Sequence, residues 1–240
     1  MTERLGTMTV GDIVAADFRA ASVFEQFGID YCCGGRRTLA EACRIAAADP
    51  DGVVRALDAL PLPSGDDDMA RWPPERLIGY ILSTHHAYVR SALPAIARDL
   101  GQVLEADRGR HPELPRVAAH FDQMRGDLEQ HLLKEERVLF PYVRDLATRD
   151  LTAARAGSPF GTVENPIRMM EREHRDATDA LRTMRELTNG FTAPPDSDAT
   201  YAACMAELAR FERDLHRHVH LENNVLFPKA VELEANRRHV

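Results

Sequence analysis

The stretches His131–Pro141 (HLLKEERVLFP) and His218–Pro228 (HVHLENNVLFP) share one pattern, His-x-x-x-Glu-x-x-Val-Leu-Phe-Pro. In each stretch a histidine and a glutamate lie four residues apart, so a helix places both side chains on the same face. One such pair is common in helical proteins and indicates little. The same pair occurring twice, with the same Val-Leu-Phe-Pro after it, predicts a duplicated unit with metal between its halves.

The composition is that of an ordinary globular protein, and the chain is long enough to bury a core of its own. It has 240 residues and a formal net charge of −8 at pH 7. This negative charge argues against nucleic acid or an anionic membrane surface as a partner. No run of about 18 apolar residues could span a bilayer, and the N-terminus lacks a signal-peptide pattern. We therefore expect a cytoplasmic protein with no nucleic acid and no membrane among its partners.

The chain is expected to divide into two helical parts. Residues 1–62 predict a small helical domain that contains the turn Tyr31-Cys32-Cys33-Gly34-Gly35 and, after it, a helix begun by a Thr38–Glu41 capping box. Residues 63–74 are rich in proline and acid and predict a linker. Residues 75–240 show helical periodicity and almost no strand alternation.

Four long helices are predicted in the second part, at roughly residues 75–106, 113–148, 163–189 and 197–236. The loops between them are short, so an all-α, antiparallel four-helix bundle is expected. Each helix has an apolar row with steps of three and four residues, and a histidine lies within each row. The rows are Leu82, His86, Val89, Leu93, Ile96, Leu100 and Val103; Phe121, Met124, Leu128, His131, Glu135 and Val138; Ile167, Met170, His174, Ala177, Leu181 and Met184; and Phe211, Leu215, His218, Glu222 and Val225.

The spacing of these histidines supports a duplicated site. His86 precedes His131 by 45 residues, and His174 precedes His218 by 44. Each half of the bundle thus has one helix with a lone histidine, followed by one helix with a His-x-x-x-Glu pair. Buried polar groups without partners are costly, so these side chains need a reason to lie in the core. Folding into a bundle brings four histidines and two glutamates to one level.

The chain has ten histidines, so the choice among them needs an argument. His85 competes with His86, but the apolar row through His85 is weaker. His216 and His220 are also four residues apart, yet their row includes Asn223 and breaks the register of the repeat. We expect these two to face solvent or to lie behind the ligands. Ordinary surface or partly buried positions are expected for His111, His120 and His239.

Four imidazoles and two carboxylates, without thiolate, suit iron or manganese better than structural zinc. Six groups are too many for one tetrahedral ion and fit two ions. If both glutamates bridge and each ion takes two histidines, an oxo or hydroxo bridge leaves a coordination position for O2, NO or water. Pro141 and Pro228 each remove a helix hydrogen bond beyond the glutamate, which predicts a bend near the site, unless they simply end the helices.

These motifs resemble the di-iron hemerythrin-like proteins and, more closely, the family called repair of iron centres. The resemblance covers nearly the whole chain and includes DYCCGGRRTLAEAC (Asp30–Cys43), which is similar to that family's short N-terminal domain with a Cys-Cys pair. It implies a hemerythrin-like bundle after that domain. It also implies two non-haem iron ions, with ligands at His86, His131, His174 and His218 and bridging carboxylates at Glu135 and Glu222.

Cys32 and Cys33 precede a Gly-Gly turn, which favours exposure. Exposed thiols near Arg36 and Arg37 would have lowered pKa values and could receive iron or a nitrosyl group, although buried structural thiols are an equal alternative. Four cysteines are too few for a disulfide scaffold in a chain of this length. Cys43 and Cys204 lie within helical patterns and are assigned to packing.

The resemblance implies a stress-response protein that repairs iron-sulfur clusters damaged by nitrosative or oxidative stress, with iron donation as the expected route. Its partners would be damaged iron-sulfur proteins and the small molecules NO or O2. One alternative is an enzyme that reduces NO to N2O at the di-iron centre. Another is reversible binding or sensing of O2 or NO. The sequence leaves the oligomeric state open, a homodimer included.

Overall fold

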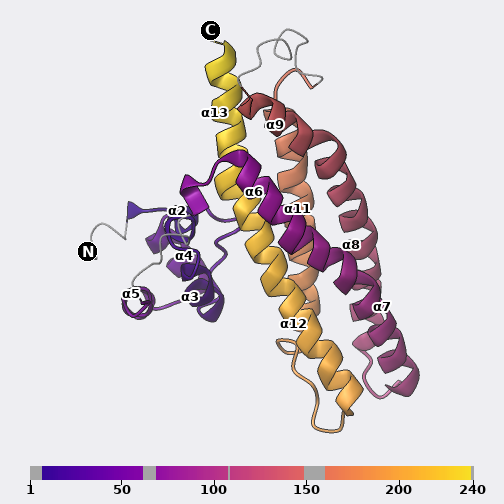
Figure 1. The fold of residues 1–240 in the computed structure, drawn as a ribbon. Coiled ribbons are helices and arrows are strands. Elements are labelled where there is room, and N and C mark those ends of the chain that lie inside the picture. The colour runs from indigo at the N-terminus through magenta and orange to yellow at the C-terminus, as the bar shows by residue number, and fades with distance from the viewer. Residues whose placement is uncertain (1–6, 62–68, 108, 149–159, 239–240) are drawn as a thin grey trace. The chain divides into compact units, whose positions relative to one another are not determined.

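The computed structural model of the chain describes residues 7–61, 69–107, 109–148 and 160–238. Within these residues the fold is entirely helical, with one isolated bridge between Thr9 and Thr38 and no strand (Figure 1). The all-α prediction is confirmed. None of the described helices is long and apolar enough to cross a membrane.

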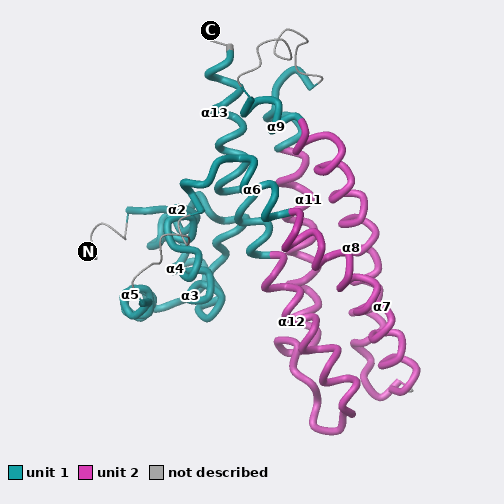
Figure 2. Tube along the Cα trace, in the orientation of Figure 1, with its two compact units in different colours: residues 1–81, 142–167, 216–240 teal, residues 82–141, 168–215 magenta. Residues whose placement is uncertain are grey.

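The chain forms two compact units, shown in Figure 2. Unit 1 contains residues 1–81, 142–167 and 216–240, and unit 2 contains residues 82–141 and 168–215. The expected domain boundaries at residues 62 and 75 stay a prediction. The expected linker lies largely outside the described residues, and its described end forms the short 3-10 turn η1 (Met69–Arg71).

The N-terminal part of unit 1 is built from short helices whose starts are set by local sequence. They are α2 (Val10–Ala16), α3 (Ala20–Gln26), α4 (Leu39–Ala46), α5 (Pro50–Asp58) and, after η1, α6 (Pro74–Tyr80). The predicted Thr38–Glu41 capping box is present: the Thr38 hydroxyl accepts from the Glu41 N–H, and the Glu41 carboxylate accepts from the Thr38 N–H. Such a cap contributes about 1 kcal/mol. Phe24 and Tyr31, both almost fully buried, lie in the core of these helices.

The long helices agree closely with the predicted ranges, but three of them contain a stretch of π-helix. The first runs through η2 (Ile81–His86) and α7 (Ala87–Asp107), and the third is α11 (Glu164–Leu187). The second comprises α8 (Leu114–Lys134), η3 (Glu135–Leu139) and α9 (Phe140–Ala147). The fourth comprises α12 (Ala199–His220), η4 (Leu221–Leu226) and α13 (Phe227–Arg238).

The two repeats form the same π turn. In each, the phenylalanine of the motif donates its N–H to the carbonyl of the glutamate five residues earlier, Phe140 to Glu135 and Phe227 to Glu222. The proline comes next. A proline has no N–H and crowds the carbonyl four residues before it, and a widened turn accommodates this without breaking the helix. The alternative that the prolines end the helices is therefore wrong, since α9 and α13 continue beyond them.

The π segments also explain where the predicted apolar rows fail. A π turn adds one residue to a helical turn and shifts the register after it. Leu82 was expected in the core but is only partly buried, whereas Ile81 is completely buried. Val138, also expected in the core, is 45% exposed. The other members of the four predicted rows are buried.

In unit 2, four helical segments pack around one core. Side-chain contacts join neighbouring helices: Tyr88 donates to Glu207 between α7 and α12, and Arg185 pairs with Glu212 between α11 and α12. His131 of α8 contacts Glu173 of α11. Burying each large apolar residue of the rows contributes about 1.5–3 kcal/mol. This packing fixes the positions of the histidines and the glutamate that lie in the apolar rows of unit 2.

Candidate metal centre

Unit 2 brings three of the predicted histidine ligands together around Glu135. His86, His131, Glu135 and His174 come from η2, α8, η3 and α11, and none is more than 1% exposed. The two oxygens of Glu135 face different histidines. Its Oε2 lies 3.4 Å from His86 Nε2, and its Oε1 lies 3.3 Å from His131 Nε2 and 4.0 Å from His174 Nε2. A buried carboxylate with imidazoles near both of its oxygens could take part in binding a cation.

The orientation of the imidazoles fits metal ligation. His86 Nδ1 lies 2.7 Å from Glu136 Oε1, and His131 Nδ1 lies 2.8 Å from Glu173 Oε2. Each ring therefore donates its Nδ1–H outward to a carboxylate, which leaves the Nε2 lone pair directed inward. His131 Nε2 and His174 Nε2 are only 3.0 Å apart. Inward-facing nitrogen lone pairs beside a buried carboxylate are a donor set for a cation, and imidazole with carboxylate suits iron or manganese.

The outer carboxylates are in turn paired with cations. Arg90 donates to Glu136, and Lys134 donates to Glu173. Hydrogen bonds from His131 and then Lys134 lower the pKa of Glu173 to about 2. Burial acts to raise the pKa of Glu136, but hydrogen bonds from Arg90 and His86 outweigh it and lower the pKa. Both carboxylates are thus ionised and able to hold their imidazoles in one tautomer.

Sequence reasoning missed Glu136 and Glu173 as partners of the ligands. Each is next to a predicted ligand in the sequence, Glu136 after Glu135 and Glu173 before His174. That adjacency was the available signal, but each glutamate accepts a hydrogen bond from a histidine on a different helix. Their roles depend on packing between helices.

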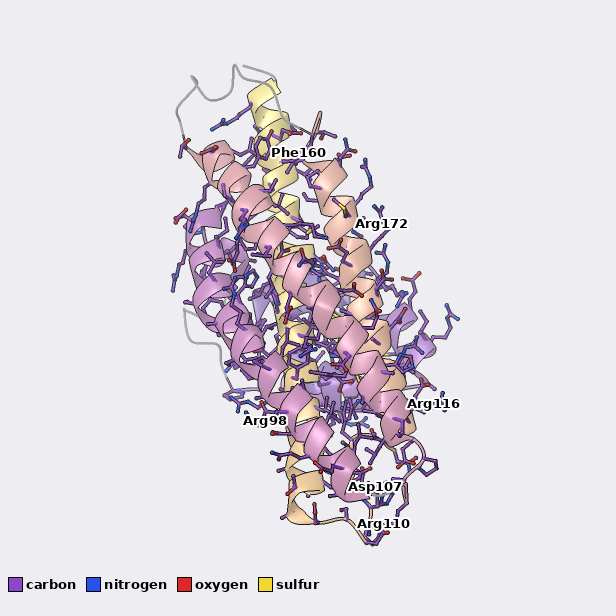
Figure 3. The ribbon with its side chains drawn as sticks, turned by 90° about the vertical axis from the view of Figure 1, so that its right-hand side faces the viewer. Arg98, Asp107, Arg110, Arg116, Phe160 and Arg172 are labelled. Carbon is purple, nitrogen blue, oxygen red and sulfur yellow. The ribbon has the colours of Figure 1, made fainter. Side chains whose placement is uncertain are left out.

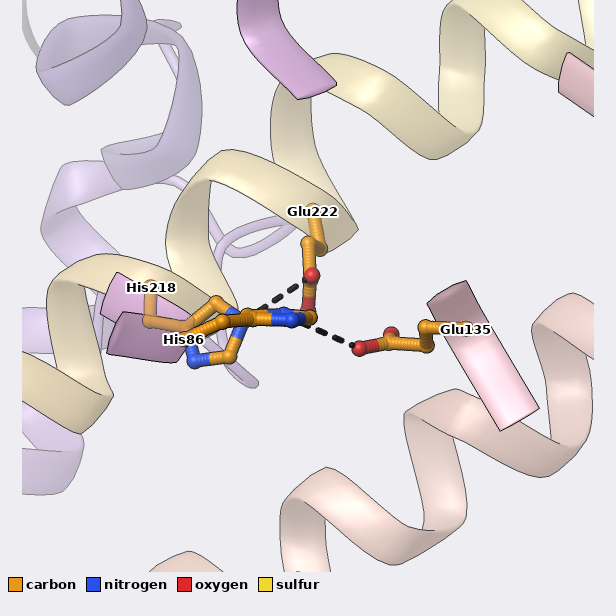
Figure 4. A group of neighbouring side chains, drawn as sticks. All are labelled: His86, Glu135, His218 and Glu222. Atoms are coloured by element: carbon orange, nitrogen blue, oxygen red, sulfur yellow. Dashed lines mark hydrogen bonds and ion pairs between the residues drawn. The ribbon is translucent and has the colours of Figure 1, made fainter. Parts of the chain in front are cut away.

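Unit 1 contains the second predicted His-x-x-x-Glu pair. His218 and Glu222 are at most 1% exposed, and His218 Nε2 lies 3.0 Å from Glu222 Oε1. Figure 4 draws this pair together with His86 and Glu135 of unit 2, and its dashed lines mark one ion pair within each unit. The same pattern of residues thus gives the same local geometry in both repeats.

The histidines that are not predicted to be metal ligands contact other residues or lie elsewhere in the fold. His85, next to His86, is buried with its Nδ1 3.0 Å from Asp214 Oδ1. Of the two alternatives predicted for His220, exposure to solvent is wrong: the ring is fully buried, 5.7 Å from the ring of Tyr31, and burial lowers its pKa to about 4. His216 and His120 are partly buried. His239 lies outside the described residues.

His111 belongs to a separate cluster at the end of α7, where Figure 3 labels Asp107 and Arg110. Its Nδ1 contacts Asp107, which is 4% exposed, and its Nε2 lies 3.4 Å from Asp196 Oδ1. The hydrogen bond with Asp107 raises the pKa of His111. This cluster links the loop after α7 to the loop that precedes α12.

The predicted exposure and lowered pKa are wrong for Cys32, which is buried, while Cys33 is partly exposed. The pKa of the Cys32 thiol is raised by the hydrogen bond with Cys33, by burial and by the charge of Asp30. Asp30 also lies 3.7 Å from Arg37 and offsets the cation that was expected to activate the thiols. Cys43 and Cys204 are buried in their helices, and no disulfide bond joins any of the four cysteines.

The family matches agree with this arrangement. Residues 77–230 match the family described as hemerythrin HHE cation binding domain, and residues 6–61 match ScdA_N, described as a domain of unknown function. The chain belongs to the hemerythrin HHE cation-binding family.

The chain is also similar to known proteins over nearly their whole length. The chain is 33% identical over 225 residues to the protein named iron-sulfur cluster repair protein YtfE of Yersinia pestis (strain Pestoides F), covering 93% of this chain and 96% of that protein. The protein of the same name from Yersinia pseudotuberculosis (serotype O:1b) gives the same identity and coverage. The resemblance to the repair-of-iron-centres family is therefore confirmed.

Proposed function

We propose that His86, His131, Glu135 and His174 form one di-iron centre with His218 and Glu222. One observation in each unit supports this. In unit 2, both oxygens of Glu135 lie near histidine Nε2 atoms, and in unit 1, Glu222 lies beside His218 in the same way as Glu135 lies beside His131. A carboxylate with imidazoles near both of its oxygens is what a bridge requires. The duplicated motif and the cation-binding family point the same way.

In this proposal the two ions are non-haem iron, joined by an oxo or hydroxo bridge. Bound iron would supply redox chemistry and exchangeable coordination positions. The protein's part is to hold the imidazoles in one tautomer through Glu136 and Glu173, and to exclude bulk water from the ligands. Arg90 and Lys134 balance the charge of these outer carboxylates at the surface.

The function we propose is repair of iron-sulfur clusters damaged by nitrosative or oxidative stress, with iron supplied by the chain to the damaged protein. The full-length likeness to proteins named for iron-sulfur cluster repair carries this proposal. The partners would be damaged iron-sulfur proteins in the cytoplasm, and Cys33, being partly exposed, is the thiol that a client or small molecule would meet first. No observation on the described residues favours NO reduction or oxygen carriage.

The proposal is tested by restoring activity to a [4Fe–4S] dehydratase that has been inactivated by NO. Iron-loaded wild-type protein should restore activity, and the variants Glu135→Gln and Glu222→Gln should bind less iron and restore less. Glu129→Gln, an exposed position on α8, is the matched control and should behave as wild type. Equal restoration by all of these proteins, or by the same quantity of free ferrous iron, would rule out repair at this site.

A further inference from the structure

The turn that carries Cys32 and Cys33 is held by one side chain of η4, Asn224. Its Nδ2 donates to the carbonyl of Cys32 at 2.9 Å and to the carbonyl of Tyr31 at 3.2 Å. Each accepting carbonyl belongs to the residue immediately before a thiol, Tyr31 before Cys32 and Cys32 before Cys33. The backbone of the turn is therefore fixed at the point where the thiols leave it.

Two glycines make room for this amide. A Cβ atom on Gly35 would lie 2.1 Å from Asn224 Oδ1, and one on Gly11 would lie 2.8 Å from it. The Gly11 N–H also donates to the Gly35 carbonyl at 2.8 Å. Any side chain at Gly35 would displace Asn224 or the turn. The segments that contain Gly11 and Gly35 thus both leave space for the Asn224 side chain.

Aromatic packing partly shields the same contact from water. The ring of His220 is fully buried, with centroids 5.7 Å from Tyr31 and 6.1 Å from Phe18. Its Nδ1 lies 3.2 Å from Asn224 Nδ2. Hydrogen bonds in such surroundings are stronger than in water, and leaving their carbonyls unpaired is costly. Opening the turn requires these bonds to break together.

The segment that holds the turn also carries a proposed iron ligand. Glu222 and Asn224 both belong to the π turn η4, two residues apart. The first repeat has Arg137 at the place of Asn224, and Arg137 is exposed. The asymmetry between the repeats therefore has a structural consequence, because the second repeat has an amide at the position that contacts the thiol-bearing turn.

We propose that Asn224 is a positioning residue that couples the thiol-bearing turn to Glu222, so that a cation bound at Glu222 slows the reaction of Cys32 with external electrophiles. A bound cation fixes the carboxylate and reduces the motion of η4. Because opening of the turn requires Asn224 to release its carbonyls, a less mobile η4 makes opening rarer. Coupling is reciprocal, so opening of the turn weakens cation binding by the same factor. The coupling rests on the proposed ligand role of Glu222, whereas the hold of Asn224 on the turn does not.

The hold of Asn224 is tested in metal-free, full-length protein by alkylation with iodoacetamide, with Cys32 and Cys33 followed separately by mass spectrometry. Asn224→Asp keeps the shape but turns the donor into an acceptor facing two carbonyls. It should raise the Cys32 rate about tenfold or more, as expected for losing two hydrogen bonds. Arg137→Asp places the same carboxylate at the equivalent position of the first repeat and should leave the rate unchanged.

A second variant guards against general damage to η4. Gly35→Ala leaves η4 intact and should raise the Cys32 rate through its clash with Asn224. Combining Gly35→Ala with Asn224→Ala should give no faster alkylation than Asn224→Ala alone, because the clashing atom is gone. Unchanged Cys32 rates in both Asn224→Asp and Gly35→Ala, with native circular dichroism, would overturn the hold of Asn224.

The coupling is tested by repeating the alkylation after anaerobic loading with ferrous iron. In wild-type protein, loading should slow Cys32 several-fold more than Cys33. In Gly35→Ala with equal iron content, loading should leave the Cys32 rate unchanged. Equal wild-type rates with and without bound iron would overturn the coupling. If the wild type takes up no iron, the proposed function fails, and the metal-free comparison still decides the role of Asn224.

Discussion

Replacing Glu173 by glutamine tests whether an outer carboxylate tunes a metal ligand. Glu173 accepts from His131 Nδ1 at 2.8 Å and pairs with Lys134, and these contacts lower its pKa from 4.5 to about 2. A shift of that size corresponds to roughly 3 kcal/mol. The side chain is 27% exposed, and solvent screening reduces the usable part to about 1–2 kcal/mol. A neutral amide still accepts a hydrogen bond but no longer stabilises charge on the imidazole.

That loss predicts an iron affinity about 5–30-fold weaker, which overlaps the range of about 10–100-fold found when partners of metal-bound histidines are removed. The assay is competition with a chelator under anaerobic conditions, with circular dichroism to confirm that the helices persist. The matched control is Asp179→Asn on the same helix, which removes an exposed carboxylate paired with Arg182. An affinity of Glu173→Gln equal to wild type, or a control that is equally weakened, would refute the role of Glu173.

Three further predictions concern stability. His111 lies between Asp107 and Asp196 and has a raised pKa, so its contribution to the free energy of unfolding is full below about pH 6.5 and is lost as pH rises through its folded-state pKa. The unfolding free energies of wild type and His111→Gln, measured in urea, should therefore converge at alkaline pH. A difference that stays constant with pH would contradict this. Thr38→Ala should cost about 1 kcal/mol at α4 and speed hydrogen exchange there, with unchanged protection counting against the cap. Leu181→Ala, at a fully buried position, should lower the unfolding free energy by about 2–5 kcal/mol, measured by urea titration, and a loss well below that range would place Leu181 outside the core.

The helices and the histidine rows could be predicted from sequence because they depend on periodicity. A core-facing row with histidine and glutamate at matching positions in both repeats can be recognised from the sequence alone. The π turns could not be predicted, because a hydrogen bond that slips by one residue leaves the composition of the helix unchanged. This is why Leu82 and Val138 were placed in the core wrongly.

The surroundings of the cysteine turn were also beyond sequence reasoning. A Gly-Gly turn with arginines nearby is typical of an exposed, reactive thiol. The turn that carries Cys32 is contacted by Asn224, which follows Cys32 by 192 residues. The same holds for His220, whose environment is set by Tyr31 and Phe18. Pairs so far apart in sequence are decided by tertiary packing alone.

The proposed di-iron centre has six side-chain ligands, with Glu135 and Glu222 as bridges. It is tested by the iron content per chain of anaerobically purified wild-type protein, compared with Glu135→Leu and Glu222→Leu. Two iron ions per wild-type chain and a clear loss in each variant are expected. Two iron ions retained in either leucine variant, or a wild-type chain that binds no iron, would contradict it.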